Sequence, residues 1–273
     1  MNKQELIEKS FHLRRNIIEV CYRSQAGHVG GSLSAIDILN VLYNHEMNID
    51  PLEPKMEYRD RFILSKGHIA EALFVTLADR GYFDERELET FSCYQSKFIG
   101  HPNNKIPGIE MNTGALGHGL SLGVGMALGN RMNQSDAYTY VMMGDGEQAE
   151  GSIWEAAMAA SHYNLDHLIA ILDRNGLQIS GTTEEVMSLK DIKAKWESFG
   201  FNVIELDGND YDEILHAFQQ AKASKGKPVL LLANTVKGKG VSFMENQIAW
   251  HHGELNESQF AQAIKELGGV VHG

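Results

Sequence analysis

Two polar residues, Asp145 and Asn175, follow strand-like runs and could share one metal ion. The apolar runs lie at 137–143 and 168–172, and the helical stretch 151–164 lies between them. Such a strand–helix–strand unit has parallel strands. Because parallel strands bring their carboxyl ends to one edge of a sheet, where open α/β sheets bind ligands, both side chains should project from the same edge.

The residue types favour a magnesium ion that carries a diphosphate. Mg²⁺ prefers hard oxygen ligands and takes one or two from protein and the rest from phosphates and water. The protein ligands would be Asp145, Asn175 and the main-chain carbonyl of Leu177. Ca²⁺ or Mn²⁺ could bind to the same oxygen ligands. Gly144 and Gly146 let the backbone approach a phosphate closely. Gly-Asp-Gly alone is also an ordinary strand-end turn, so the matched asparagine is what favours a site.

Alternating patterns predict a doubly wound α/β fold, with a mostly parallel sheet flanked by helices. After an opening amphipathic helix, the expected strands are 61–65, 137–143, 168–172, 202–206 and 229–233, and the expected helices are 34–46, 69–80, 84–91, 116–132, 151–164, 189–199, 211–224 and 258–267. The glycine-rich stretch 116–132 predicts close packing, either inside this chain or against a partner. No repeat or long linker divides the sequence, so we expect one domain over residues 1–273.

Composition excludes several classes of function. The net charge of −12, without a basic block, argues against nucleic acid or an anionic membrane surface as a partner. No stretch reaches the roughly 20 apolar residues of a membrane span, and the N-terminus lacks the apolar core of a signal peptide. Cys21 and Cys93 are the two cysteines of 273 residues, which fits a reducing cytosol and a cytoplasmic enzyme.

Several motifs together resemble one known family. The run 144–181 is similar to the thiamine-diphosphate motif, in which Gly-Asp-Gly precedes a distant asparagine, and more narrowly to its transketolase version. Other blocks resemble transketolases in the same order, namely Ala26-Gly27-His28, Leu64-Ser65-Lys66-Gly67-His68, Gly100-His101-Pro102, Thr113-Gly114-Ala115-Leu116-Gly117-His118-Gly119 and His252-Gly253. The likeness covers nearly the whole chain. It implies the thiamine-diphosphate-binding fold of the diphosphate-holding (PP) type, with thiamine diphosphate and Mg²⁺ as cofactors.

The resemblance gives four histidines a role. His68 and His252 match positions that contact the diphosphate, and His252 also lies near the reacting carbon. His28 and His101 match groups that bind the hydroxyls of the donor sugar and move protons to and from its oxygens, which suits histidine near neutral pH. His118 stands where many members of the family carry glutamine, so it receives no role. A lone histidine is otherwise an ordinary surface or core residue.

Further positions carry over in the same way. Gly114 and Leu116 match cofactor contacts, with Leu116 against the thiazolium, and Gly146 matches a main-chain donor to phosphate. Ile179 matches an apolar wall of the thiazolium pocket. Leu116 and Ile179 are equally plausible as core residues. Glu150 matches an acid near the subunit contact, although an exposed helix start explains it as well.

The resemblance also implies a second chain. In transketolases, the glutamate beside the aminopyrimidine and most acceptor-phosphate contacts lie on another domain, and this sequence ends at Gly273, about where that domain would begin. We therefore expect the N-terminal, diphosphate-binding subunit of a split transketolase, which works with a C-terminal subunit in an α2β2 heterotetramer. The expected reaction transfers a two-carbon ketol unit from a ketose phosphate to an aldose phosphate, as in pentose phosphate metabolism. Sulfonated or branched sugars stay open as substrates.

Three alternatives remain at this point. The α subunit of a 2-oxo acid dehydrogenase also carries a Gly-Asp-Gly…Asn site, although the Gly-His blocks fit sugar chemistry better. A truncated, non-catalytic cofactor-binding protein would share the same motifs. A dinucleotide-binding dehydrogenase is the weakest alternative, because the glycine spacing at 119–125 lies within an expected helix and not after a strand.

Overall fold

A single parallel sheet organises the fold in the computed structural model, which describes residues 1–269. Within that range the sheet has five strands in the order β1-β2-β3-β5-β4, and every adjacent pair is parallel. The strands are β1 (Arg61–Leu64), β2 (Thr139–Gly144), β3 (Leu168–Arg174), β4 (Asn202–Asp207) and β5 (Val229–Asn234). All five were expected from the sequence, with bounds that differ by one or two residues.

Apart from 183–187, which was not expected, the helices match the predicted pattern, although three of them start three to five residues away from the predicted position. They are α1 (Lys3–Ser24), α2 (Val29–Val41), α3 (Ala70–Asp79), α4 (Gly119–Met132), α5 (Gly151–His162), α6 (Thr183–Met187), α7 (Ile192–Ser198), α8 (Tyr211–Ala223) and α9 (Glu257–Glu266). Short 3₁₀ turns are η2 (Gly67–Ile69), η3 (Glu85–Thr90), η4 (Gly146–Ala149) and η5 (Ile248–His251), and α2 ends in a π turn, η1 (Leu42–Glu46).

Helix α2 begins five residues earlier than expected. Its first turn contains Gly30 and Gly31, a pair that reads as loop in the sequence. In the structure a Cβ on Gly30 would lie 2.5 Å from the carbonyl oxygen of Trp250, and one on Gly31 would lie 2.9 Å from Ile69. These glycines serve close packing inside a buried helix, so tertiary contacts override their low helix propensity.

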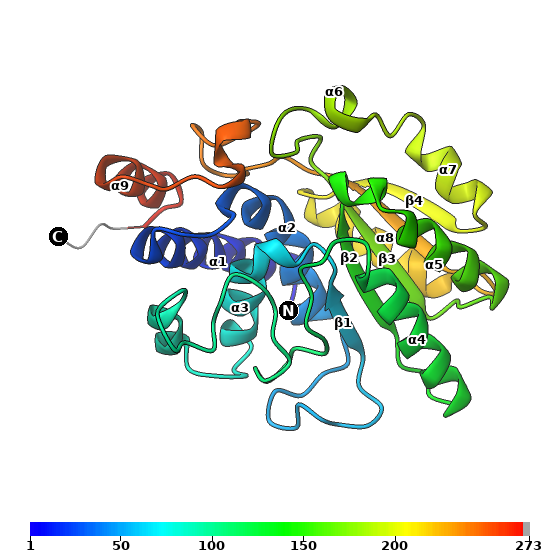
Figure 1. Ribbon diagram of the computed structural model, residues 1–273. Helices are drawn as coiled ribbons and strands as arrows, with labels where there is room; N and C mark the ends of the chain where they lie inside the picture. Colours follow the sequence, from blue (N-terminus) through cyan, green and yellow to red (C-terminus); the bar gives the residue numbers. More distant parts are fainter. Residues whose placement is uncertain (270–273) are drawn as a thin grey trace.

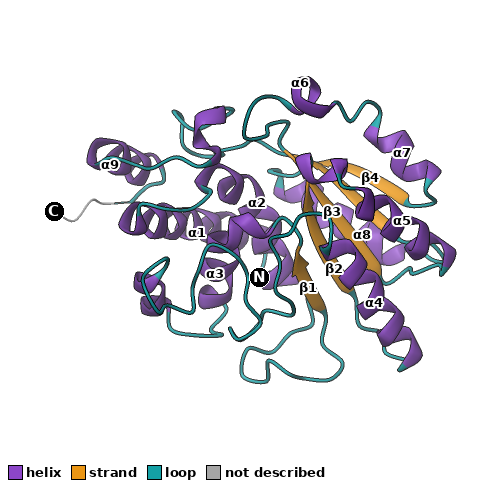
Figure 2. Ribbon diagram, viewed as in Figure 1, coloured by secondary structure: helices purple, strands orange, loops and turns teal. Residues whose placement is uncertain are grey.

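Alternate residues along each strand face two separate apolar cores, which is the doubly wound arrangement that the sequence predicts. On β3, Ile169 and Ile171 pack with α1, α2, α3, α8 and α9, whereas Leu168, Ala170 and Leu172 pack with α4, α5 and α7. Figure 1 shows α4 and α5 on one side of the sheet and α1, α2 and α3 on the other. Figure 2 shows the strands fanning between the two helical layers.

The structure shows which glycines of α4 pack against the rest of this chain and which lie open. A Cβ on Gly119 would collide with Ser65, and one on Gly123 would collide with Val141 of β2, so these two glycines let α4 lie close to the sheet. Gly125 and Gly129 have open space where a Cβ would stand. One row of small residues therefore packs inside this chain, and the other lies on its surface.

Within residues 1–269, no helix combines the length and the apolar run that a bilayer crossing needs. Both cysteines are free thiols, Cys21 buried and Cys93 exposed. Since the single sheet organises all the described elements, we retain one domain over residues 1–273 as a proposal.

Candidate active site

A cavity of about 390 Å³ opens at the carboxyl ends of β2 and β3, the edge where open parallel sheets bind ligands. Its walls come from segments far apart in the sequence. They consist of His28, Gly31, Lys66, His68, Gly114, Leu116, Gly144, Asp145, Gly146, Glu147, Asn175, Leu177, Gln178, Ile179, Ser180, Lys237 and His251. Of the site residues predicted from the sequence, His101 and His252 are the two outside this lining.

The two expected metal ligands lie at the same sheet edge, as predicted. Gly144 of β2 pairs with Asp173 of β3, so the two strands leave the sheet at one level. The Asp145 carboxylate is 4% exposed and accepts the N–H of Gly146 at 2.8 Å and the N–H of Gly176 at 2.6 Å. Asn175 follows β3 directly, and its Oδ1 accepts the N–H of Leu177 at 3.2 Å.

Charged groups of both signs surround the Asp145 carboxyl. Burial raises the pKa of the Asp145 carboxyl, and the neighbouring Asp173 raises it further, while Lys66 and the two N–H donors act in the opposite direction. The carbonyl of Leu177 faces the same space, where it accepts the Lys237 ammonium at 3.3 Å. A carboxylate, an amide and a carbonyl therefore converge here, and their role as metal ligands stays a prediction.

Two buried lysines, which were not among the predicted site residues, bring positive charge to the cavity. Lys66, after β1, lies 2.5 Å from the Asp173 carboxylate, and both side chains are almost fully buried. Asp173 also accepts the hydroxyls of Ser34 and Thr235. Lys237, after β5, has its pKa lowered to about 8 by burial and then by Lys66. Lys66 stands inside the Leu-Ser-Lys-Gly-His block, so that motif could have identified it, whereas Lys237 had no local signal.

A cluster of histidine rings covers the other side of the cavity. The ring of His28 lies 5.0 Å from that of His68, 5.6 Å from that of His251 and 4.7 Å from that of His252. The rings of His68 and His251 are stacked at 5.6 Å. The Lys237 ammonium lies 2.7 Å from Nδ1 of His251. Since an ammonium can only donate, Nδ1 accepts and the ring hydrogen of His251 sits on Nε2.

The sequence analysis selected His252, but the structure places its neighbour His251 on the cavity wall. His252 is exposed and packs edge-on against His28. Both follow Trp250 in one turn, and local sequence does not show which of two adjacent histidines faces inward.

The pKa values of the clustered histidines are lowered. Burial lowers the pKa of His28 to about 4, and the charges of His252 and His101 act in the same direction. Burial and then Lys237 lower the pKa of His251 to about 3. Burial, and then Lys66, also lowers the pKa of His68.

The segment 113–118, called the glycine turn here because it contains Gly114 and Gly117, precedes α4 and carries most of the remaining predicted contacts. His101 is exposed. A Cβ on Gly114 would lie 2.5 Å from the ring carbon Cδ2 of His101, so the ring leaves no room for a side chain at position 114. Gly114 also has a φ of +137°, so glycine is required there on two counts. Leu116 is half-buried on the cavity wall. His118 is exposed with Nδ1 3.1 Å from the Leu116 carbonyl, and nothing in the structure gives it a role.

The structure excludes the core interpretation of two apolar residues. Ile179 is 74% exposed at the cavity, and Leu116 is only half-buried, so neither belongs to a core. Gly146 starts η4 beside Gln178. Glu150 is the exposed N-cap residue of α5 and makes no side-chain capping bond. A partner contact and an ordinary helix start both fit that position.

A buried glutamate that the sequence analysis also missed fastens the glycine turn to the sheet. The Glu147 carboxylate is 2% exposed and accepts the N–H of Gly117 at 2.8 Å, the N–H of Gly144 at 3.0 Å and the hydroxyl of Ser65. It therefore ties together the ends of β1 and β2 and the turn before α4. Its position three residues after Gly144 is a signal, since a carboxylate at a helix start commonly binds main-chain N–H groups.

The residues present fit a metal-bound diphosphate. Within residues 1–269, no cluster of three or more His, Cys, Asp or Glu side chains is arranged to hold a metal by itself, so Asp145, Asn175 and Leu177 would need phosphate oxygens to complete a shell. Lys66 and Lys237 lie beside them with positive charge. Gln178 on the cavity wall has a buried Nε2 without a hydrogen-bond partner, which could donate to a phosphate oxygen.

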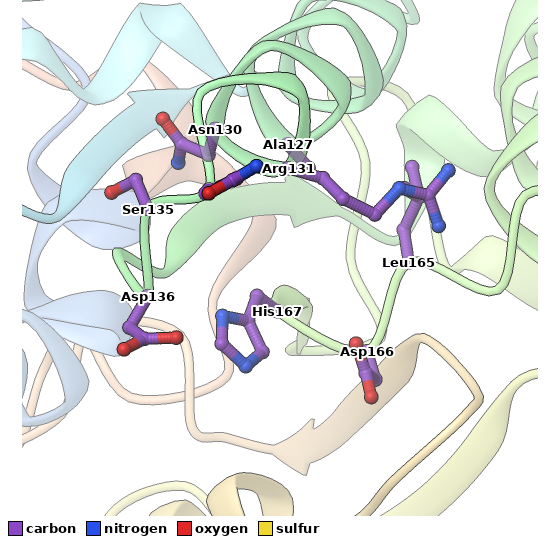
Figure 3. A pocket seen from close by; sticks show the side chains of 9 residues that line it. Ala127, Asn130, Arg131, Ser135, Asp136, Leu165, Asp166 and His167 are labelled. Atoms are coloured by element: carbon purple, nitrogen blue, oxygen red, sulfur yellow. The ribbon is translucent and has the colours of Figure 1, made fainter.

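A second cavity, of about 290 Å³, lies at the opposite edge of the sheet, before β2 and β3 (Figure 3). Arg131, Asp136, Asp166 and His167 are among its walls. No predicted site residue lies there, and amino ends of parallel strands are not the edge where such sheets bind ligands. Most of the predicted site residues line the first cavity instead.

Fold and site together define an α/β domain built to hold a phosphate-bearing cofactor at its carboxyl edge. A family profile described as "Transketolase, thiamine diphosphate binding domain" matches residues 6–271. The chain belongs to the transketolase family, and it corresponds to the N-terminal, diphosphate-binding part. This excludes the dinucleotide-binding dehydrogenase, whose glycine fingerprint is absent because residues 119–125 lie within α4.

Relatives of similar length carry narrower names. The chain is 50% identical over 254 residues to one of the subunits of the apulose-4-phosphate transketolase of Phocaeicola vulgatus, covering 93% of this chain and 90% of that protein. It is 44% identical over 256 residues to a 6-deoxy-6-sulfo-D-fructose transketolase subunit of a Clostridium species, covering 93% of each. Both names describe one subunit of an enzyme.

Solved transketolases share the fold and are much longer. The enzyme of Campylobacter jejuni superposes with a TM-score of 0.93 at 33% identity, over 98% of this chain and 43% of that chain. The enzyme of Leishmania mexicana gives a TM-score of 0.92 at 30% identity, over 98% of this chain and 42% of that chain. The present chain therefore spans less than half the length of these enzymes.

Proposed function

We propose that this chain is the diphosphate-binding subunit of a two-chain transketolase that moves a two-carbon ketol unit from a ketose to an aldose. One observation carries the proposal: a single cavity joins the Asp145–Asn175 pair to the histidine cluster. The first group suits a magnesium diphosphate and the second suits proton movement on a hydroxylated substrate. Membership in the transketolase family supports the same reaction type.

Residues in different parts of the cavity would have different roles. Asp145, Asn175 and the carbonyl of Leu177 would hold Mg²⁺, and Lys66 and Lys237 would offset the diphosphate charge. Thiamine diphosphate, when bound, supplies the carbon nucleophile that attacks the ketose carbonyl and stores the electrons.

Other residues would shape the rest of the cofactor site. His68 would donate to the diphosphate, and the main-chain N–H of Gly146, which donates to Asp145 at 2.8 Å, would have to turn from Asp145 or be shared with it to do the same. Gly114 lets the backbone come close, and Leu116 and Ile179 would form an apolar wall against the thiazolium ring.

The histidines would orient the donor and move its protons. Because burial keeps His28 and His251 largely neutral near pH 7, each can accept a proton from a substrate hydroxyl or donate a ring N–H. His101 and His252 are exposed and lie against His28 and Gly114 of the cavity wall, His252 against the former and His101 against the latter, where they would contact the hydroxyls of the sugar.

A second chain is part of the proposal. The site needs an acid beside the aminopyrimidine, and the solved transketolases are more than twice as long as the segment that this chain matches. Similar-length relatives bear subunit names. The solvent-facing side of α4, with Gly125, Gly129 and the 82% exposed Met132, offers a flat surface for that C-terminal subunit. An α2β2 assembly in the cytoplasm is the arrangement we propose.

The donor and acceptor are proposed only by class. Relatives are named for apulose 4-phosphate and for 6-deoxy-6-sulfofructose, so a phosphorylated or sulfonated ketose is the donor class that we propose. The anchors for the acceptor would lie on the partner chain.

Reconstitution tests this proposal directly. The chain would be expressed with the product of an adjacent transketolase C-terminal gene and assayed with ketose–aldose pairs, thiamine diphosphate and Mg²⁺. We expect ketol transfer by the pair and none by this chain alone. The His101→Ala variant should bind cofactor nearly normally and show a raised KM for the donor. Transfer by the chain alone would contradict the two-chain proposal, and activity on 2-oxo acids but not ketoses would contradict the reaction.

A further inference from the structure

A buried carboxylate without a counter-charge lies behind the histidine cluster. Glu71, in the first turn of α3, is 0% exposed. One carboxylate oxygen, Oε1, accepts the main-chain N–H of His28, and the other, Oε2, has no partner in good hydrogen-bond geometry, although the Ser32 hydroxyl, itself without a partner, stands beside the carboxylate. Among the ion pairs within residues 1–269, none involves Glu71. Burial raises the pKa of this carboxyl, while hydrogen bonds and the positive charge that His252 can carry act in the opposite direction.

Such a residue is costly to keep. A carboxylate removed from water without a paired cation loses several kcal/mol of hydration free energy. A neutral side chain of the same shape could accept the His28 N–H equally well. Perturbed, unpaired carboxylates beside a cavity are more often found at functional sites than elsewhere. An ionised Glu71 would therefore need a use that an amide could not supply.

The surroundings of Glu71 point to histidine protons as that use. Its neighbours are the Cys21 thiol from α1, with Sγ 4.0 Å from Oε1, Ser32 from α2, and His28. His252, after η5, is exposed and near enough for its charge to act on the Glu71 carboxyl. Glu71 is the one carboxyl among these groups, and burial raises the pKa of the Cys21 thiol well above its ordinary value, so the thiol brings no negative charge near neutral pH.

The groups that face His28 carry no compensating negative charge. They are the rings of His68, His101, His251 and His252 and the ammonium of Lys237. Nδ1 of His28 is buried and without a partner. Any proton taken up by this cluster therefore adds positive charge among neutral and positive neighbours, and Glu71 is the carboxylate that contacts the cluster, through the His28 backbone.

We propose that Glu71 is a positioning residue for ketol transfer, which holds the His28 main chain and stabilises the proton that the His28–His252 pair takes from the donor. This inference rests on the proposed function. As the C2–C3 bond of the ketose breaks, its electron pair stays with the two-carbon fragment. The C3 hydroxyl gives its proton to a histidine nitrogen and becomes the carbonyl oxygen of the released aldose. Glu71 takes no proton, and its negative charge stabilises the imidazolium. In the second half-reaction, the proton returns to the acceptor oxygen.

The Glu71→Gln variant, in the two-chain enzyme, separates charge from shape. The amide oxygen can still accept the His28 N–H, but the charge is gone. An opposite charge at short range raises a neighbouring pKa by about 1–3 units. The acid limb of the kcat/KM profile for the donor should therefore move to lower pH by about one unit, and the plateau should fall about tenfold because the base is weaker. Cofactor affinity should stay unchanged, since Glu71 does not line the cavity.

Asp60→Asn is the matched control. The Asp60 carboxylate is 5% exposed and accepts the N–H groups of Asn48 at 2.9 Å and Tyr138 at 2.7 Å, at the amino end of β1, far from the cavity edge. This variant should lose stability without moving the pH profile. Glu71→Asp keeps the charge, so it should keep the acid limb in place even if the shorter side chain lowers the rate. If the glutamine variant does not fold, the pH profile of Glu71→Asp still tests whether the charge is what matters.

Three results would overturn the inference. The first is a Glu71→Gln profile that coincides with that of the wild type, and the second is an equal loss of cofactor binding and activity. The third is an acid limb that moves in Glu71→Asp by as much as in Glu71→Gln. Failure of the wild-type pair to bind cofactor or to transfer ketol units would instead overturn the proposed function itself, and this inference with it. Measuring the wild type first keeps the two kinds of failure apart.

Discussion

The carboxylate of Asp145 accepts the main-chain N–H of Gly176 at 2.6 Å, so the ends of β2 and β3 are tied together directly. Asn175 is held beside Asp145 by this bond before any cation arrives. A preorganised pair loses little conformational entropy when it binds a ligand. Oδ2 accepts the N–H of Gly176 and Oδ1 accepts that of Gly146, so each carboxylate oxygen keeps one lone pair for a metal.

Asp145→Ala should abolish the stabilisation of this protein by thiamine diphosphate and Mg²⁺. A ligand at about 100 times its Kd adds roughly 2.7 kcal/mol to the free energy of unfolding. We expect that increment in the wild-type two-chain enzyme and none in the variant, as measured by thermal unfolding with and without both cofactors. Magnesium alone and cofactor alone serve as controls. An unchanged increment would remove Asp145 from the metal site.

Asp173→Ala should destabilise the chain by about 3–5 kcal/mol, because it leaves the buried Lys66 ammonium unpaired. Urea unfolding would measure the loss. The double variant Lys66→Met with Asp173→Leu should recover part of it, since replacing both charges removes the unpaired one. A loss below about 1 kcal/mol for Asp173→Ala, in the range of exposed ion pairs, would show that Lys66 reaches solvent or another acceptor.

Two glycines of α4 should respond in opposite directions. Gly123→Ala should cost about 1–3 kcal/mol, because the methyl group meets Val141. Gly125→Ala should stabilise the isolated chain by about 0.5–1 kcal/mol, because the space is open and alanine favours a helix. Chemical unfolding of both variants tests this pair.

The same helix face tests the proposed partner contact. Gly125→Leu should leave the isolated chain folded and weaken its association with the C-terminal subunit, as measured by sedimentation or size-exclusion chromatography of the mixture. Undisturbed assembly would place that subunit on another surface.

The stability of the chain should fall as the pH falls from about 6.5 to about 4. The folded pKa of His28 is lowered to about 4 and that of His251 to about 3, from an ordinary value of 6.5. Between these values the unfolded chain binds protons that the folded chain does not, so the free energy of unfolding rises with pH in this window. Above about pH 6.5 both histidines are neutral in the folded and in the unfolded chain, so the free energy of unfolding no longer changes with pH through these groups.

Urea unfolding at a series of pH values, in the wild type and in His28→Asn, isolates the effect. The variant should show a shallower dependence on pH between about 4 and 6.5, because one of the groups is gone. His216→Asn, on the outer surface of α8, is a control that should keep the wild-type slope. Identical slopes in His28→Asn and wild type would contradict the lowered pKa.

Local pattern in the sequence was enough to place most of the fold. The alternating apolar runs predicted the five strands and their parallel sheet, since strand and helix periodicity depend on near neighbours in the chain. The Gly-Asp-Gly turn and Asn175 were placed at one edge for the same reason. The start of α2 was misplaced, because Gly30 and Gly31 favour a loop by propensity and are helical only through contacts with Trp250 and Ile69.

The residues that emerged only from the folded chain depend on segments that are distant in the sequence. Lys237 reaches the cavity from beyond β5, Glu71 lies beneath His28 from α3, and His251 rather than His252 turns inward. No periodicity or spacing encodes such contacts, because they arise when separate elements pack around one sheet edge. The order of residues thus predicted the sheet, the juxtaposition of Asp145 and Asn175 and the family resemblance, whereas packing selected the charges that surround them.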